Sequence, residues 1–90
     1  MPKFVIERDM PGVGNMSPQD AKAAAVKSCA VLRELGPQVQ WRESYVTKDK
    51  IYCVYIATDE KLVREHARLT GFPADRVSAV AATIDPTTAE

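Results

Sequence analysis

The sequence has a single histidine, His66, and two cysteines, Cys29 and Cys53, among its 90 residues. It contains no CxxC pair and no cluster of cysteine and histidine, so we do not expect a structural zinc site within one chain. The two cysteines fall in different predicted elements, and we expect reduced thiols rather than a disulfide. Any metal chemistry must therefore draw on very few nitrogen and sulfur ligands.

Long apolar runs and net charge are also absent. No segment reaches the roughly 18 apolar residues of a membrane span, and the N-terminus lacks the charged-then-apolar pattern of a signal peptide. Twelve basic and twelve acidic side chains cancel, which argues against nucleic acid or an anionic membrane as the main partner. We expect a cytoplasmic protein with no nucleic-acid partner and no membrane partner.

The length is enough for one domain with a modest core. We expect a single domain over residues 1–85, followed by a polar C-terminal tail over residues 86–90. Chains this short often gain stability by self-association, and a net charge near zero is compatible with close contact between subunits.

Local patterns in the first half predict a strand, a helix and a second strand. A β-rich run covers residues 3–8 and ends at a Pro-Gly loop. Ser17, as a cap, followed by Pro18 predicts a helix that ends at Gly36-Pro37. Small residues at its N-terminal end, such as Ala21 and Ala25, should let this helix lie close to a sheet. Alternation then predicts a strand over residues 39–47.

The second half repeats this order from a polar turn at residues 48–50. Residues 51–57 are almost wholly apolar and predict a central strand buried on both faces. Thr58 is the expected capping hydroxyl of a second helix, which Gly71 ends. The inward face of this helix is predicted to hold Leu62, Val63, His66, Ala67 and Thr70. Residues 76–84 predict a last strand.

The resulting order is strand, helix, strand, strand, helix, strand. This predicts an α+β, ferredoxin-like βαββαβ sandwich, an antiparallel sheet with both helices on one face. Because side chains alternate across a sheet, some aromatic surface must face away from the helices, and such a patch usually marks an interface. We therefore expect a homodimer packed sheet against sheet, of the dimeric α+β barrel type.

The register of the central hairpin stays open at this point. One loop length pairs Tyr45 with Tyr52 and puts Glu43 beside Val54. The other pairs Tyr45 with Cys53 and puts Glu43 beside Tyr55. Turn chemistry fixes register, and this turn lacks the glycine that would decide it.

Several blocks of the sequence carry a resemblance to a known family. They are Ser44–Thr47, Asp49–Tyr55, Val63–Arg68 and Gly71–Val77, together with Phe4–Arg8 and Pro11-Gly12. They resemble a small bacterial family, long described as a domain of unknown function, whose members are often labelled nickel-binding proteins. The resemblance covers nearly the whole chain. It implies a ferredoxin-like homodimer that binds Ni²⁺ at the dimer surface, for sequestration or nickel tolerance, but it assigns no ligands.

Four residues are the candidate metal ligands: His66, Cys53, Glu43 and Glu7. Imidazole suits Ni²⁺ as well as zinc and copper, although an inward-facing His66 is more often a core histidine bonded to a strand. Cys53 is either a small core residue or a thiolate ligand near His66. Glu7 and Glu43 lie within strands, where each is either a ligand or a partner in an ion pair.

Two enzymatic interpretations stand beside nickel binding. The Met-Pro start resembles the tautomerase superfamily, in which a terminal proline amine acts as general base; here that residue would be Pro2, and a retained Met1 would block its nitrogen. The other is a dimeric-barrel enzyme acting on a small organic molecule between walls of Trp41, Tyr45 and Tyr55. Our prediction remains a dimeric protein that binds Ni²⁺, or another divalent transition metal ion, without catalytic turnover.

Overall fold

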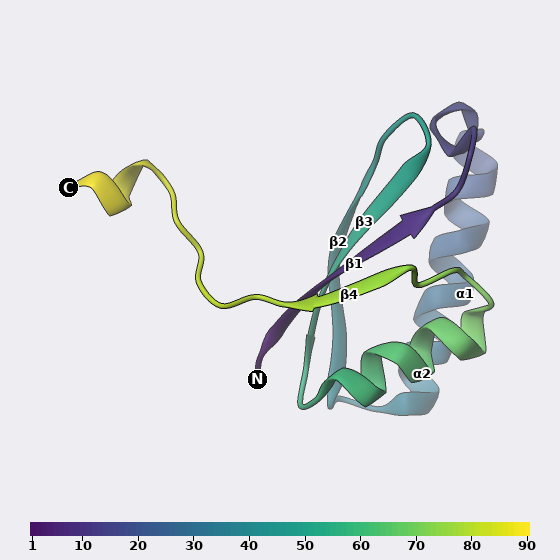
Figure 1. Ribbon diagram of the computed structural model, residues 1–90. Helices are drawn as coiled ribbons and strands as arrows, with labels where there is room; N and C mark the ends of the chain where they lie inside the picture. Colours follow the sequence, from purple (N-terminus) through teal and green to yellow (C-terminus); the bar gives the residue numbers. More distant parts are fainter.

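The computed structural model describes residues 1–90 and contains one four-stranded antiparallel sheet in the order β2-β3-β1-β4. The strands are β1 (Lys3–Asp9), β2 (Val39–Val46), β3 (Lys50–Ala57) and β4 (Arg76–Ala79), and the helices are α1 (Pro18–Leu35) and α2 (Glu60–Thr70). Short 3₁₀ helices lie at Val13–Asn15 (η1) and Pro86–Ala89 (η2). Both α-helices lie on the same side of the sheet (Figure 1). This α+β arrangement is compatible with the predicted ferredoxin-like fold.

The helix ends follow from local capping. The Ser17 hydroxyl accepts a hydrogen bond from the Asp20 backbone N–H at 3.1 Å, as predicted for the start of α1. The prediction that Thr58 caps α2 is wrong. Asp59 is the cap, and its carboxylate accepts from the Leu62 N–H at 3.2 Å. Thr58 still belongs to the strand end, because its N–H donates to the carbonyl of Gln38 at 3.0 Å.

The hairpin adopts the register that pairs Tyr45 with Tyr52 and Glu43 with Val54. The turn has no glycine, and a side-chain hydrogen bond holds it instead. Thr47 Oγ1 donates to the Lys50 carbonyl at 2.9 Å across a two-residue turn. The turn also lies against the loop that follows β1, where the Gly14 N–H donates to the Lys48 carbonyl at 2.9 Å. A bulge at Arg42 shifts the register nearer the start of β2.

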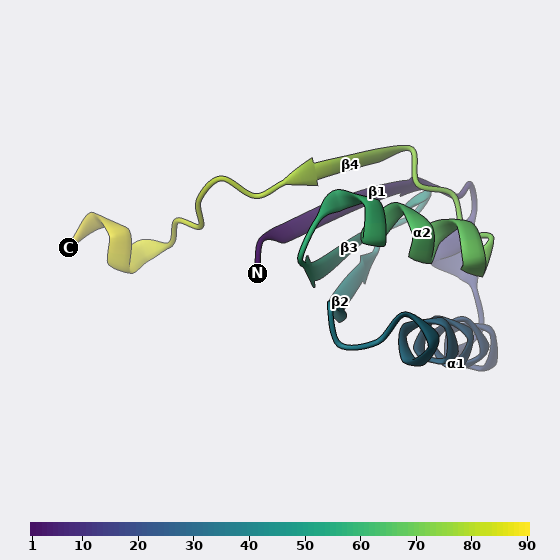
Figure 2. The same ribbon diagram turned by 90° about the horizontal axis from the view of Figure 1, so that it is seen from below.

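The core lies between the sheet and the helices. Its buried members are Phe4, Ile6, Val39, Cys53, Tyr55, Ala57 and Val63. The expectation that β3 is buried on both faces holds only for the helix-facing side. On the opposite side Tyr52, Val54 and Ile56 are half-buried, because no element of the chain covers them. We call this uncovered side the open face (Figure 2).

The last strand is shorter than predicted, because β4 ends at Ala79 rather than continuing to residue 84. The Val80 N–H makes the final bond to the sheet, to the Lys3 carbonyl at 2.8 Å. The Pro2 carbonyl is engaged on the other side of β1, where it accepts from the Ala57 N–H at 3.0 Å. Residues 81–90 therefore leave the sheet as an exposed arm (Figure 1). No helix of the protein is long and apolar enough to cross a bilayer.

Candidate functional site

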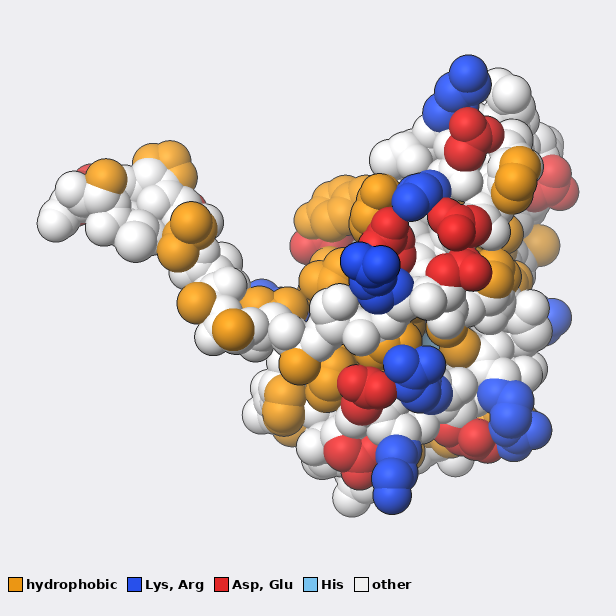
Figure 3. All heavy atoms as spheres, in the orientation of Figure 1, with side chains coloured by type: hydrophobic (Ala, Val, Ile, Leu, Met, Phe, Trp, Pro, Cys, Tyr) orange, Lys and Arg blue, Asp and Glu red, His pale blue; other side chains and the backbone are white.

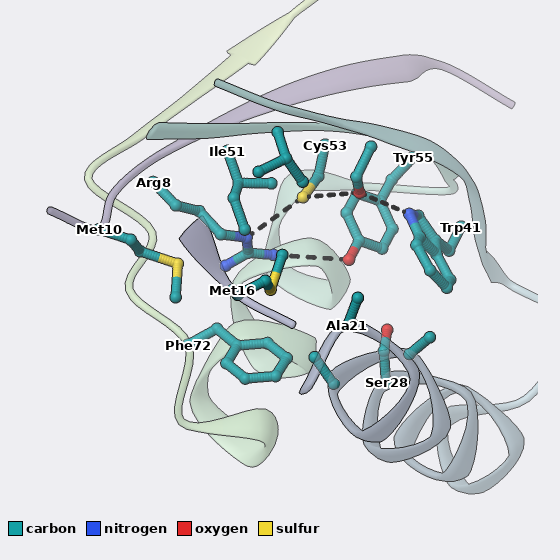
Figure 4. Close-up of a pocket in the computed structure, with 14 residues that line it drawn as sticks. Arg8, Met10, Met16, Ala21, Ser28, Trp41, Ile51, Cys53, Tyr55 and Phe72 are labelled. Atoms are coloured by element: carbon teal, nitrogen blue, oxygen red, sulfur yellow. Dashed lines mark hydrogen bonds between the residues drawn. The ribbon is translucent and has the colours of Figure 1, made fainter. Parts of the chain in front are cut away.

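A cavity of about 250 Å³ lies between the N-terminal half of α1 and the helix-facing side of β2 and β3 (Figure 4). It is lined by Arg8, Met10, Met16, Ala21, Ala24, Ala25, Ser28, Trp41, Ser44, Val46, Ile51, Cys53, Tyr55 and Phe72. The small residues of α1 were expected to bring the helix close to the sheet. Their side chains are instead too short to fill the gap, so the cavity remains.

Arg8 is the least expected residue of this cavity, because it is only 2% exposed. Its guanidinium donates to the Pro73 carbonyl at 2.7 Å, to Cys53 Sγ at 3.4 Å and to the Tyr55 hydroxyl at 3.5 Å. No carboxylate forms an ion pair with it, although four ion pairs occur elsewhere in the chain. Arg8 is not among the candidate site residues predicted from the sequence. The available signal was its alternation with Phe4 and Ile6, both buried on the same face of β1.

His66 is fully buried on α2. Its Nε2 atom lies 2.9 Å from the Ser28 hydroxyl of α1, and its ring lies 5.1 Å from that of Tyr55. The other ring nitrogen, Nδ1, has no hydrogen-bond partner. Burial lowers the pKa of His66, and the nearby Arg8 charge lowers it further, so the imidazole is neutral near pH 7. His66 is thus a core histidine, bonded to a helix rather than to the expected strand.

Cys53 is 5% exposed and takes part in a chain of hydrogen bonds along the cavity wall. Trp41 Nε1 donates to the Ser44 hydroxyl at 2.9 Å, and Ser44 donates to Cys53 Sγ at 3.0 Å. Arg8 approaches the same sulfur from the other side (Figure 4). Both Cys53 and the half-buried Cys29 are free thiols.

Glu7 and Glu43 lie on the open face, away from His66 and Cys53. Glu7 forms an ion pair with Lys50 at 2.9 Å, and this hydrogen bond lowers the pKa of the Glu7 carboxyl. The neighbouring Glu43 carboxylate, as an acceptor for the phenol O–H, raises the pKa of Tyr45. The four candidate ligands therefore form two pairs on opposite sides of the sheet. No group of three or more His, Cys, Asp or Glu side chains is placed to hold a metal ion within one chain.

The residues of the two enzymatic interpretations are also separated. Trp41 and Tyr55 line the cavity, whereas Tyr45 pairs with Tyr52 on the open face and is 54% exposed. Pro2 is exposed just before the start of the central strand β1 and does not line the cavity. The three proposed aromatic walls therefore do not enclose one space within the chain.

These features define a small α+β domain with two helices on one side of a four-stranded antiparallel sheet, and an apolar cavity beneath one helix. A family model described as "Nickel responsive protein SCO4226-like" matches residues 4–80, and the chain belongs to this family. The match confirms the resemblance that the sequence blocks indicate.

A solved structure supports the fold. The crystal structure of SCO4226 from Streptomyces coelicolor A3(2) superposes with a TM-score of 0.76, over 91% of this chain and 99% of that chain. The two sequences are 18% identical, so this similarity speaks for the fold alone. No curated protein matches the sequence.

Proposed function

We propose that this protein binds Ni²⁺ as cargo in the cytoplasm and withholds it from other sites, without catalytic turnover. The observation that carries this proposal is membership, over residues 4–80, of a family described as nickel responsive. Withholding the ion requires only donor atoms in a suitable arrangement. Imidazole nitrogen and carboxylate oxygen both serve as donors for divalent transition metals.

The cavity is a poor place for the ion. The Arg8 guanidinium contacts the sulfur of Cys53, and a buried cation repels a divalent metal strongly where the surroundings are apolar. His66 Nε2 is already engaged by Ser28, which leaves Nδ1 as its free donor atom, and no group of three His, Cys, Asp or Glu side chains forms around it. The donor set around Cys53 and His66 therefore does not fit Ni²⁺ while Arg8 lies beside it.

We place the ion on the open face instead, with Glu7 and Glu43 as ligands. Both carboxylates face away from the helices, and Lys50, the partner of Glu7, is an exposed side chain that an incoming cation can displace. Two carboxylates from one chain leave most coordination positions unfilled. The remaining protein ligands must come from a second copy.

A homodimer formed through the open face would supply them. Its centre consists of the half-buried apolar side chains of Val5, Val54 and Ile56, which nothing in the chain covers. The arm of residues 81–90 carries further hydrophobic side chains into solvent, including Ile84 at 79% exposure (Figure 3). A two-fold contact through the open face would bury Val5, Val54 and Ile56 and bring the carboxylates of both copies to one interface.

Calorimetric titration of tag-free, metal-free protein with Ni²⁺ tests the proposal. We expect Glu43→Gln to weaken binding by about tenfold or more, since a charged ligand becomes neutral. Glu34→Gln, an exposed position on α1, is the matched control and should bind as the wild type does. Absence of binding by the wild type would contradict nickel binding. Loss of binding in His66→Gln and Cys53→Ala, but not in the glutamate variants, would show that the ion binds in the cavity and not on the open face.

A further inference from the structure

We propose that the cavity beneath α1 binds a small apolar carboxylic acid, whose carboxylate pairs with Arg8. The proposal concerns the helix-facing side of the sheet and does not depend on nickel binding. It rests on two independent observations: a buried cation with no anionic partner, and an apolar space beside that cation.

The buried cation comes first. A guanidinium has five N–H donors, and in Arg8 three of them meet a backbone carbonyl, the sulfur of Cys53 and a phenol, none of which is a carboxylate. Removing a charge from water without a counter-charge is costly, so buried charges are normally paired. A carboxylate accepts two parallel hydrogen bonds from one guanidinium, which gives both the missing charge and the missing acceptors.

Tyr55 adds a second group at the same end of the cavity. Its hydroxyl lies 3.5 Å from Arg8, and the two point toward each other in Figure 4. Burial raises the pKa of Tyr55, so the phenol keeps its proton and remains able to donate to an anion. A carboxylate bound there would meet a cation and a neutral O–H donor.

The other lining residues determine the polarity and size of the non-carboxylate part of the ligand. Eleven of its 14 lining residues are hydrophobic, among them Trp41, Ile51 and Phe72. Met10 and Met16 have flexible side chains that adapt to ligands of different shape. The volume of about 250 Å³ lies just below the usual range for ligand pockets, about 300–1,000 Å³, so the ligand is small. A phosphate head would bring more oxygens than the apolar walls can satisfy, which favours a carboxylate.

The test compares octanoate with octanamide, which has the same chain but no charge. Each is titrated into metal-free protein containing a chelator, and binding is followed by the fluorescence of Trp41, the one tryptophan of the chain. We expect octanoate to bind at least about tenfold more tightly than octanamide, and octyl phosphate to bind more weakly than octanoate. Equal affinity of the acid and the amide would mean that Arg8 is already neutralised within the protein, and would overturn the proposal.

Two variants locate the site. Ala21→Phe places a ring in the cavity and should abolish octanoate binding, whereas Ala23→Phe, exposed on the same helix and outside the lining, should leave it unchanged. Arg8→Met keeps an unbranched apolar stem but removes the guanidinium and its charge, and should make the affinities for octanoate and octanamide equal. Octanoate binding that survives Ala21→Phe would contradict the proposal even if Arg8→Met fails to fold.

Discussion

Between pH 6.5 and the pKa of His66 in the folded protein, lowering the pH should reduce the free energy of unfolding because His66 is protonated in the unfolded chain. His66 is fully buried, and burial lowers its pKa below the ordinary value of 6.5 for a histidine side chain. The unfolded chain therefore takes up a proton at His66 at a higher pH than the folded chain does. Well above 6.5 the imidazole is neutral in both states, and the free energy of unfolding does not depend on it. Below 6.5 the unfolded state is favoured progressively, until the folded-state pKa is reached.

The size of the effect follows from proton linkage. The free energy of unfolding should fall by at most about 1.4 kcal/mol for each pH unit in this window. The shifted carboxyl pKa values do not interfere, because those of Glu7, Glu65 and Asp85 are lowered from 4.5, 4.5 and 3.8 and act further into acid. Since a domain of this size has a stability of roughly 5–13 kcal/mol, the change is measurable.

Urea unfolding followed by Trp41 fluorescence, between about pH 8 and about pH 5, gives the assay. His66→Gln is the control, because glutamine can still hydrogen-bond Ser28 but does not titrate, and its stability should stay flat. The one histidine of the chain also gives a single ring proton resonance, whose titration reports the folded pKa directly. A wild-type curve that runs parallel to that of His66→Gln, or a resonance that titrates above 6.5, would refute the reasoning.

Three other perturbations test the fold. Gly14→Ala should destabilise by about 1–3 kcal/mol in chemical unfolding, because its new Cβ would lie 2.9 Å from the backbone of the hairpin turn; an unchanged midpoint would contradict this contact. Asp59→Ala should lower the free energy of unfolding by about 1 kcal/mol through loss of the α2 cap, whereas Thr58→Ala should lower it less. The reverse order would support Thr58 as the cap. Deletion of residues 81–90 should leave the thermal midpoint of the domain nearly unchanged, because no sheet hydrogen bond lies beyond Val80; a large drop would show that the arm packs on the domain.

Sequence patterns predicted the elements well because each depends on local chemistry. Ser17 and Gly71 mark helix ends by caps that lie within a turn of them. The length of β4 was not predictable in this way, since it depends on pairing with β1, which lies about seventy residues away in the chain. Composition alone made residues after Ala79 look like strand.

The candidate site was only partly visible in the sequence. Alternation along β1 and β2 places Glu7 and Glu43 on the open face, but that conclusion needs the hairpin register that the turn left undecided. Arg8 was overlooked because an arginine in a short strand is usually exposed. The cavity arises where the short alanine side chains of α1 face the bulged strand β2. This packing depends on residues far apart in the chain, so no local sequence pattern predicts it.

The central claim is that two copies of this chain share Ni²⁺ through the open face, and one comparison tests it most directly. Val54→Lys puts a charge at the centre of that face and should give a monomer by light scattering, while Val26→Lys, on an already exposed position of α1, should leave the dimer intact. Titration of both variants with Ni²⁺ should then show binding by the dimeric variant and none by the monomeric one. Equally tight binding by a folded Val54→Lys monomer would contradict the account.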